Sequence, residues 1–246
     1  ICFKTILSIM DGPKKEDYDQ FTFNSKNPLA RYAHRSRYQN GLCLITKKEN
    51  LKVLDIGCGD GRFLNEVQEN EESAQLLGYD PYMDSALFPK IEISKKWSEV
   101  EGWIKQKGRF DVVVCFEVLE HLNTPRQIEI LEKAKTALKD DGVFIVSVPI
   151  EKGIPSVIKN LRRIMIHYDS KIYNFSNLAA SFCGYKTKWM KQHRKESFYL
   201  SHMGFFFDDL EKVVASFFKT KSKIYSPFKK LNAKVNSQVF YVLNKK

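Results

Sequence analysis

Two carboxylates and an imidazole lie within five residues of one another, at Glu117, Glu120 and His121. If these residues begin a helix, they share one face of it, because they are three and four residues apart. Such a set could bind a divalent metal ion with open coordination positions. It could also carry out acid–base chemistry or have a structural role. The residue types leave these three interpretations open, and we expect no bound metal.

A glycine-rich turn at Gly57, Gly59 and Gly61 follows the apolar segment 53–56. This segment is expected to form a buried strand, and residues 62–68 have the apolar spacing of a helix. Glycine allows positive φ and a close approach of a ligand to the backbone. A helix N-terminus adds free N–H groups and a positive dipole end. Strand, turn and helix together predict a cradle for a nucleotide-like ligand, although such glycines also make ordinary tight turns.

A second predicted strand, residues 76–80, ends on Asp80, 19 residues after Gly61. In a doubly wound sheet, an acidic side chain at this place accepts hydrogen bonds from the two ribose hydroxyls of an adenosine. The position of the third glycine in a dinucleotide fingerprint holds Arg62 instead. The turn therefore suits a compact ligand without a pyrophosphate, which argues against a nicotinamide-dependent oxidoreductase.

Four segments, in the correct order, resemble the motifs of class I S-adenosylmethionine-dependent methyltransferases. Residues 53–64 resemble the first motif and residues 78–80 the second. Residues 110–122 resemble the fourth strand with its following turn, and residues 138–149 a turn with the fifth strand. The resemblance implies a seven-stranded, doubly wound, Rossmann-like α/β sheet. It also implies S-adenosyl-L-methionine as the cofactor and methyl transfer as the reaction.

The resemblance further implies which residues hold the cofactor. Asp80 would bind the ribose hydroxyls, and Asp55 would act near the methionine amino group through a water molecule. The glycines would line the methionine and ribose side, while Phe116 and Glu117 would lie along the cofactor at the end of the fourth strand. The complete predicted cofactor set is Asp55, Gly57, Cys58, Gly59, Gly61, Asp80, Pro81, Phe116 and Glu117.

Methyl transfer to a hydroxyl requires a general base. The sulfonium is already activated, so the protein must place the acceptor in line with the methyl group. The acceptor hydroxyl must also lose its proton, and histidine is the usual base near neutral pH. His121 is our first candidate and His202 the second.

The triplet of Glu117, Glu120 and His121 is similar to that of metal-dependent members of the family. These include small-RNA 2′-O-methyltransferases and a quinone-biosynthesis O-methyltransferase. The RNA enzymes add a downstream histidine, for which His202 is a candidate. The same pattern also occurs in members with no known metal, so the resemblance does not decide between the interpretations.

The segment 151–204 is longer than the one helix that the family needs before its terminal hairpin. Between residues 151 and 200 the chain has ten Lys or Arg and only three Asp or Glu, with aromatic residues among them. We interpret the segment as a basic cap inserted over the acceptor. The same composition is typical of nucleic-acid binding, and it also fits an anionic small acceptor or a solvated basic surface.

The expected acceptor is a hydroxyl on a small molecule, a glycan or a lipid, which could be anionic. No Asn/Asp-Pro-Pro-aromatic tetrapeptide follows the fourth predicted strand, which argues against methylation of a nucleobase amine. RNA 2′-O-methylation, with or without a metal ion, remains an alternative, although nucleic acid is not favoured. A second alternative is a cofactor-binding partner subunit that has lost catalysis. The oligomeric state is left open.

We divide the chain into four segments and expect a cytoplasmic protein. Its 246 residues, 43% of them hydrophobic, can bury one substantial core. Five cysteines without a Cys-x-x-Cys pair are typical of a reducing compartment. The apolar start is too short for a membrane span or a convincing signal peptide.

The four segments are an N-terminal extension with a helix (1–48), the cofactor-binding core (49–150), the cap (151–204) and a C-terminal helix with a strand hairpin (205–246). Within them we expect helices over 28–46, 94–107, 125–138 (N-capped by Thr124) and 207–217, and late strands over 221–225 and 237–243.

Overall fold

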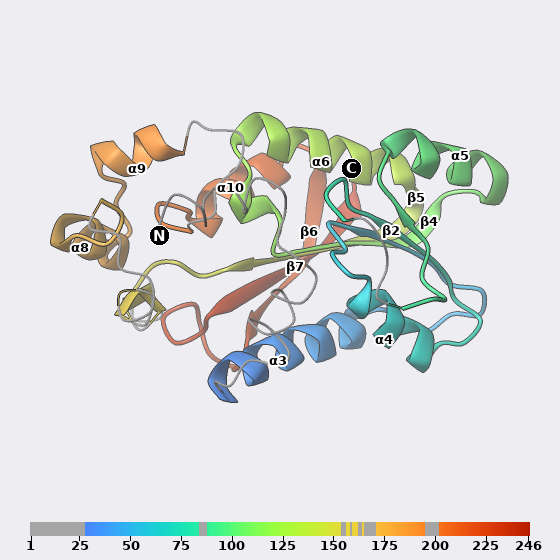
Figure 1. The fold of residues 1–246 in the computed structure, drawn as a ribbon, viewed down its shortest axis with the longest axis horizontal. Helices are drawn as coiled ribbons and strands as arrows, with labels where there is room; N and C mark the ends of the chain where they lie inside the picture. The colour runs from blue at the N-terminus through green and yellow to red at the C-terminus, as the bar shows by residue number, and fades with distance from the viewer. Residues whose placement is uncertain are drawn as a thin grey trace, which may run out of the picture. The chain divides into compact units, whose positions relative to one another are not determined.

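The computed structural model describes residues 28–83, 88–153, 156–157, 159–161, 164, 171–194 and 202–246. The chain divides into two compact units, Ile1–Val112 and Val113–Lys246. The strands form one seven-stranded sheet in the order β3-β2-β1-β4-β5-β7-β6; Figure 1 labels β2, β4, β5, β6 and β7. The strand order changes direction after β1, as it does in doubly wound sheets. The predicted fold class is therefore confirmed.

The first unit contains a parallel set of three strands: β1 (Lys52–Ile56), β2 (Gln75–Tyr79) and β3 (Ile93–Ser94). In the register of β1 with β2, Asp55 lies opposite Gly78. From Val53 onward, β1 is buried at every position. Strands covered on both faces are apolar almost throughout, which explains why this one reads as a short hydrophobic run.

Three described helices belong to the first unit: α3 (Pro28–Leu44), α4 (Arg62–Asn70) and α5 (Trp97–Lys107). Phe63 and Val67 of α4 are buried, and Phe63 makes an edge contact of 5.5 Å between ring centroids with Tyr38 of α3. The helix expected over 94–107 begins three residues later than predicted, because Ser94 pairs with β2 as part of β3.

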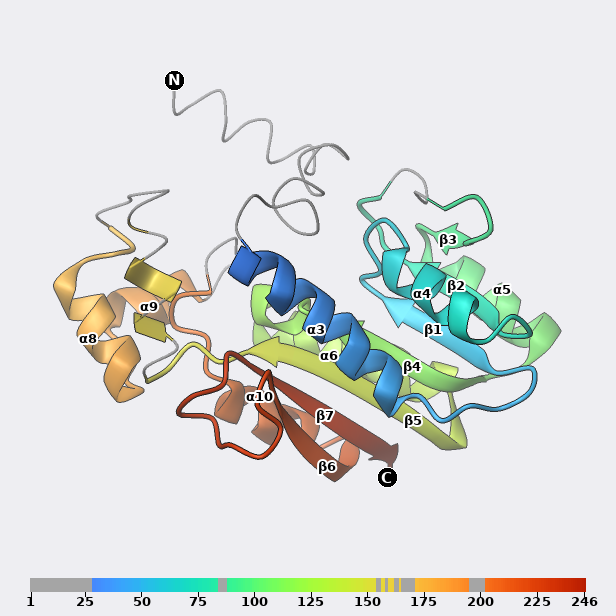
Figure 2. The same cartoon turned by 90° about the horizontal axis from the view of Figure 1, so that it is seen from below.

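The second unit is built on an antiparallel group of strands. β4 (Phe110–Phe116) crosses the division between the units, and β5 (Leu138–Pro149), β6 (Phe218–Ser226) and β7 (Gln238–Lys245) follow it. β7 lies between β5 and β6 and is antiparallel to both (Figure 2). The segment 138–149, expected to be a turn followed by the fifth strand, is strand throughout, since β5 begins directly after the preceding helix. The two late strands are confirmed and are longer than predicted.

In the second unit, the N-terminal cap of helix α6 differs from the predicted one. Asn123, not Thr124, is the N-cap of α6, because its side chain accepts a hydrogen bond of 3.1 Å from the backbone N–H of Arg126. Pro125 then lies in the first turn, where its missing N–H costs nothing. The described helices are η1 (Leu119–His121), α6 (Thr124–Ala137), α8 (Phe175–Cys183), α9 (Lys188–His193) and α10 (Phe207–Val214).

The described part of the predicted cap contains α8 and α9. In two perpendicular views these helices lie beside each other, beyond the end of β5 (Figures 1 and 2). Thr187 caps α9 by accepting a hydrogen bond of 3.2 Å from the N–H of Met190, and its own hydroxyl donates to Asn177 of α8 at 2.7 Å. Several cap residues, including Arg162 and Arg163, lie outside the described residues, as does the N-terminal extension up to residue 27. Among the described helices, none combines the length and apolar character needed to cross a bilayer.

Candidate active site

The turn between β1 and α4 requires its three glycines. Gly57, Gly59 and Gly61 have φ angles of 78°, 54° and 82°, in the left-handed region that other residues avoid. A Cβ atom placed on Gly59 would meet no heavy atom within 4 Å. The space beside Gly59 is therefore open on the side where a side chain would stand.

The backbone N–H groups of this turn were expected to be free, but several of them are already hydrogen-bonded. Four of them already donate hydrogen bonds within the first unit: Gly57 to the carbonyl of Tyr79 (2.7 Å), Gly59 to Asp80 Oδ2 (3.1 Å), Gly61 to the carbonyl of Cys58 (3.1 Å) and Arg62 to Asp60 Oδ1 (3.1 Å). For these four groups the prediction is wrong. Bonds within the turn and to the end of β2 hold it in shape, so these groups are not poised to receive a phosphate.

Asp80 lies beside the turn and directly after β2, which ends one residue before the predicted strand 76–80 does. Its Oδ2 accepts the hydrogen bond from Gly59, and its Oδ1 accepts one of 2.9 Å from the N–H of Tyr82. A carboxylate offers about four lone-pair sites. The backbone N–H of Met83 also interacts with this carboxylate, so Asp80 keeps only part of its accepting capacity for a ligand such as a ribose hydroxyl.

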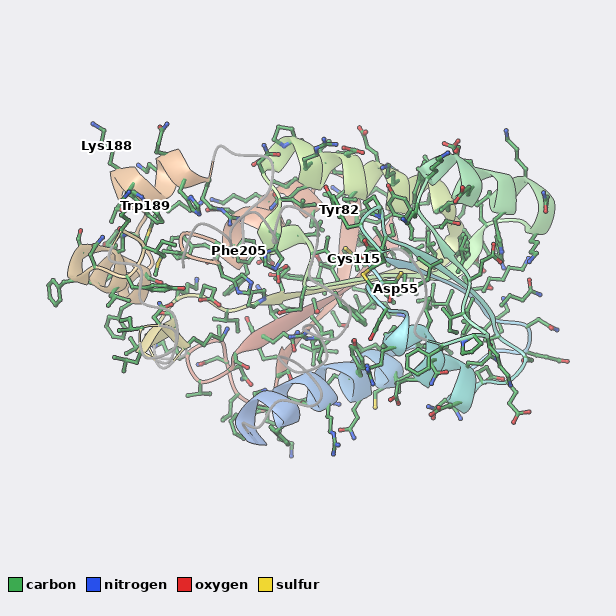
Figure 3. All side chains as sticks on the ribbon, viewed as in Figure 1. Asp55, Tyr82, Cys115, Lys188, Trp189 and Phe205 are labelled. Carbon is green, nitrogen blue, oxygen red and sulfur yellow. The ribbon has the colours of Figure 1, made fainter. Side chains whose placement is uncertain are left out.

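Three carboxylates interact around this turn. Asp55 is 3% exposed, and burial, followed by the charges of Asp80 and Asp60, raises its pKa to about 8 (Figure 3). Burial also raises the pKa of Asp80, although the backbone donors to its carboxylate oppose this shift. Such a group of acids attracts positive charge and repels an anion. The site is therefore suited to a cationic ligand and unsuited to a pyrophosphate.

Two further residues of the predicted cofactor set, Cys58 and Pro81, differ in exposure. Cys58 is buried, and a Cβ on Gly78 would lie only 2.5 Å from its sulfur, so the thiol packs against the bare backbone of β2. Burial raises the pKa of this thiol. Pro81 is exposed, as is Tyr82 beside it (Figure 3). Contact of either predicted residue with the cofactor remains a prediction.

In the second unit, Glu117 does not share a helical face with Glu120 and His121. Its φ angle of 56° ends β4 and prevents a helix from starting there, so that η1 begins only at Leu119. The Glu117 carboxylate instead accepts a hydrogen bond of 2.8 Å from Gln238 Nε2. The expectation of one face carrying all three residues is wrong, because the left-handed residue turns the chain before the helix.

Phe116 and Glu117 are held from neighbouring strands of the second unit. The ring of Phe116 makes an edge contact with Phe240 of β7, at 5.8 Å between centroids. The N–H of Glu117 donates to the carbonyl of Ser147 at 3.0 Å, and Gln238 Nε2 lies 3.3 Å from the Ser147 hydroxyl. The end of β4 is therefore fixed by β5 and β7.

The two predicted catalytic histidines lie against each other. His121 Nε2 and His202 Nε2 are 3.3 Å apart, with ring centroids at 4.7 Å. Glu120 is fully buried, and its Oε1 is 3.8 Å from His121 Nε2. Residues 81 positions apart in the chain thus form one cluster with the carboxylate of Glu120.

The same cluster has the composition of a metal site. Glu120, His121 and His202 each offer one ligand atom, and these atoms all lie within 4.8 Å of one another. Imidazole and carboxylate ligands with open positions suit several divalent ions. The geometry therefore permits metal binding as well as acid–base chemistry, and the ligand set includes Glu120 but not Glu117.

His202 is positioned by a glycine turn packed on α9. Gly204 has a φ angle of 79°, and a Cβ there would lie 2.9 Å from the side chain of Met190, which is fully buried. A larger residue at Gly204 would therefore displace the turn that carries His202. Arg194, the residue that follows α9, also contacts the cluster: its Nη2 donates to the backbone carbonyl of Glu120 at 2.8 Å.

Three side chains in these clusters were not predicted from the sequence: Asp60, Glu151 and Gln238. Glu151 is 1% exposed, and its Oε1 lies 3.3 Å from His202 Nδ1. Its position two residues after the fifth strand was a usable signal, since ligand sites in α/β sheets lie at the carboxyl ends of strands. Gln238 carried no such signal, because its partner Glu117 is 121 residues away.

The sequence model of a family described as "Methyltransferase domain" matches residues 29–206. The chain belongs to this methyltransferase family. The predicted resemblance to class I S-adenosylmethionine-dependent methyltransferases is thereby confirmed.

Two relatives of this methyltransferase are named for O-methylation. It is 34% identical over 133 residues to the ubiquinone biosynthesis O-methyltransferase of Glaesserella parasuis serovar 5 (strain SH0165), covering 49% of this chain and 52% of that protein. It is 25% identical over 213 residues to the mitochondrial ubiquinone biosynthesis O-methyltransferase of Saccharomyces cerevisiae (strain ATCC 204508 / S288c), covering 78% and 67%. The chain thus spans about half the length of the first relative.

Solved structures confirm the fold of this methyltransferase. The magnesium protoporphyrin IX methyltransferase ChlM of Synechocystis PCC 6803, determined with bound SAH, matches with a TM-score of 0.58. The match covers 99% of each chain at 13% sequence identity. A likeness at this level of identity concerns the fold alone.

Proposed function

We propose that this chain transfers the methyl group of S-adenosylmethionine to a hydroxyl on a small molecule, a glycan or a lipid. The observation that carries the proposal is the bond from Gly59 to Asp80 beside the buried Asp55. S-adenosylmethionine has a sulfonium, an ammonium and a ribose with two hydroxyls. A group of carboxylates next to an open glycine turn complements all three features, whereas it would repel a dinucleotide.

Each predicted cofactor residue keeps its proposed role. Asp80 would accept the ribose hydroxyls, Asp55 would act near the ammonium group, and the glycines would leave room for the methionine and ribose side. Cys58 and Pro81 would border the same ligand. Phe116 and Glu117 are proposed to contact the cofactor from the end of β4, since ligands of doubly wound sheets bind beyond the carboxyl ends of the strands.

The proposed reaction is a displacement at the methyl carbon. The acceptor hydroxyl gives its proton to His121 as its oxygen forms a bond to the methyl carbon. The carbon–sulfur bond breaks with its electron pair going to sulfur, so the sulfonium becomes a neutral thioether. His121, now an imidazolium, then returns the proton to solvent. A general base of this kind typically contributes about 10² to 10⁴ in rate.

Similar proteins and the charge of the cap both bear on the class of the acceptor. The relatives named for O-methylation support a hydroxyl acceptor and a small molecule. The cap, residues 151–204, has ten Lys or Arg residues and only three Asp or Glu between positions 151 and 200. This excess of positive charge supports an anionic acceptor. We also propose the four-segment organisation described above, with the core at 49–150, and a cytoplasmic location.

A metal-assisted reaction is the second candidate. The cluster of Glu120, His121 and His202 supports it, since these groups could hold a divalent ion that polarises the acceptor oxygen. The two candidates use the same histidines in different ways, as a base or as ligands. We favour the metal-free reaction, in agreement with the sequence-based expectation.

Binding and turnover test this proposal separately. Isothermal titration calorimetry should detect binding of S-adenosylhomocysteine and no binding of NAD. Transfer of a labelled methyl group should then be measured with a catechol, a sugar phosphate, a fatty alcohol and a short RNA as acceptors. Binding of NAD in preference to S-adenosylhomocysteine would contradict the assignment. Cofactor binding without transfer to any acceptor would favour an inactive partner subunit.

A further inference from the structure

Glu151 is a buried carboxylate with no role in the proposed reaction so far. It follows β5 by two residues and is 1% exposed. Its Oε1 faces two groups, His202 Nδ1 at 3.3 Å and Lys159 Nζ at 3.2 Å. A buried carboxylate is costly unless it is paired and hydrogen-bonded. Both partners reduce this cost, but only one of them belongs to the histidine cluster.

The backbone around Glu151 is tied in place. The hydroxyl of Ser181 in α8 donates to the carbonyl of Glu151 at 2.7 Å. The N–H of Ile150 donates to the carbonyl of Ser237 at 2.9 Å, and Lys159 donates to the carbonyls of both residues, at 3.0 and 2.9 Å. The carboxylate of Glu151 therefore reaches His202 from a rigid position.

The chemistry of the carboxylate decides the tautomer of His202. An ionised carboxylate only accepts hydrogen bonds. The proton of a neutral His202 must then lie on Nδ1, where it can be donated to Glu151. The other ring nitrogen, Nε2, is left without a proton and acts as an acceptor.

The short distance between the two rings also fixes the proton of His121. His202 Nε2 faces His121 Nε2 at 3.3 Å, and two bare nitrogens would repel each other. His121 must therefore carry its proton on Nε2 and donate it to His202. The Glu120 oxygen at 3.8 Å favours the same proton position. This arrangement leaves Nδ1 of His121 unprotonated, which is what a general base needs.

We propose that Glu151 is a positioning residue that acts through His202 to hold His121 in the tautomer whose Nδ1 accepts the acceptor's proton. This inference rests on the proposed function for its catalytic meaning, but the tautomers themselves can be observed without turnover. Among the described residues, the groups facing the two histidines include Glu120 and Glu151, and Lys159 lies behind Glu151. When His121 becomes an imidazolium, its Nε2 still donates to His202, and the negative charge of Glu151 on the far side of His202 stabilises the new positive charge.

Nuclear magnetic resonance of ¹⁵N-labelled histidine side chains tests the tautomers directly. The protein is treated with a chelator and studied at about pH 8, where an ordinary histidine is neutral. His202→Gln and His121→Gln spectra assign the two rings. We expect a proton on Nδ1 of His202 and on Nε2 of His121. A His202 ring protonated on Nε2 in the unmodified protein would overturn the proposal, whatever the enzyme methylates.

Glu151→Gln is the decisive variant because it keeps the shape and removes the obligatory acceptor. The amide can donate to Nδ1 as well as accept from it, so His202 should no longer show a single tautomer. With any acceptor found above, kcat should fall by about tenfold or more, a part of what a general base contributes. The KM for S-adenosylmethionine and the affinity for S-adenosylhomocysteine should stay within about twofold.

Two controls separate positioning from a structural role. Glu129→Gln removes an exposed carboxylate that pairs with Arg126 and Lys133 in α6, and it should leave kcat and both tautomers unchanged. If Glu151 only neutralises Lys159, the double variant Glu151→Gln/Lys159→Gln should recover the kcat lost by the single variant. Under our proposal the double variant stays as slow as Glu151→Gln, with melting temperatures recorded for both.

Discussion

The Oδ2 atom of Asp80 accepts a hydrogen bond of 3.1 Å from the backbone N–H of Gly59. The acid proposed to bind the ribose and the turn proposed to border the methionine are thus one bonded unit. Because neither group has to be ordered when the cofactor arrives, less entropy is lost on binding. The bond also means that a change at Asp80 affects the turn as well as the ligand.

Asp80→Ala should weaken binding of S-adenosylmethionine by at least about a hundredfold. Two charge-assisted hydrogen bonds to the ribose would be lost, each on the order of 1.5–3 kcal/mol. Calorimetry measures the affinity, and circular dichroism checks the fold. Asp141→Ala, at an exposed position of β5, is the matched control and should bind normally. An affinity within about threefold of the unmodified protein would show that Asp80 is not the ribose ligand.

Asp55→Asn should stabilise the cofactor-free protein more at pH 8 than at pH 5. The folded-state pKa of Asp55 is about 8, while an unfolded aspartate titrates near 4. Between these values the folded state binds the extra proton, so stability falls as the pH rises. Four pH units at about 1.36 kcal/mol each give an upper bound of about 5 kcal/mol, which the neutral amide would recover.

Urea unfolding of the unmodified protein and of Asp55→Asn at both pH values checks this prediction. Asp141→Asn serves as the exposed control and should show no pH-dependent difference. Equal stabilisation by Asp55→Asn at pH 5 and pH 8 would mean that the carboxyl of Asp55 is already ionised in the folded state.

His121→Ala should lower kcat by about two to four orders of magnitude and leave cofactor affinity nearly unchanged, because a general base acts only on the acceptor. Chelator treatment of the unmodified enzyme should have no effect. If a metal is used instead, chelation should abolish activity and Mg²⁺ or Mn²⁺ should restore it. Steady-state kinetics with and without chelator distinguish these outcomes.

Variants of Glu117 and Glu120 provide a second test for a bound metal ion. Only Glu120 lies in the group with His121 and His202, whereas Glu117 is bonded to Gln238. A metal requirement should therefore be sensitive to Glu120→Gln and insensitive to Glu117→Gln. A His121→Ala enzyme with near-normal kcat and no metal requirement would leave positioning of the acceptor as the whole of catalysis.

Charge reversal on α9 should weaken an anionic acceptor. Lys188 and Lys191 are exposed on this helix, and Lys188 is labelled in Figure 3. The variant Lys188→Glu/Lys191→Glu should raise the KM of the acceptor and leave the affinity for S-adenosylhomocysteine unchanged. The effect should shrink with added salt, because exposed charges are screened. Unchanged acceptor kinetics would assign these lysines to a solvated surface.

Local rules in the sequence were sufficient for β1, its turn, α4 and Asp80. The apolar run 53–56, the glycines at alternate positions and the helical spacing after Gly61 each depend on neighbours within a few residues. Steric limits on φ and the periodicity of buried positions act at that range. The family and the fold class followed from the same segments, since four of them occur in the correct order.

Tertiary structure alone decided which polar side chains meet. Glu117 and Glu120 are three residues apart, yet the left-handed backbone of Glu117 sends one carboxylate to Gln238 and the other to the histidines. Glu151 reaches His202 across 51 positions. Such contacts depend on strand register, on the Gly204 turn and on packing against α9. The periodicity of apolar residues in the sequence does not predict these features, because each one joins segments whose separation in the chain is arbitrary.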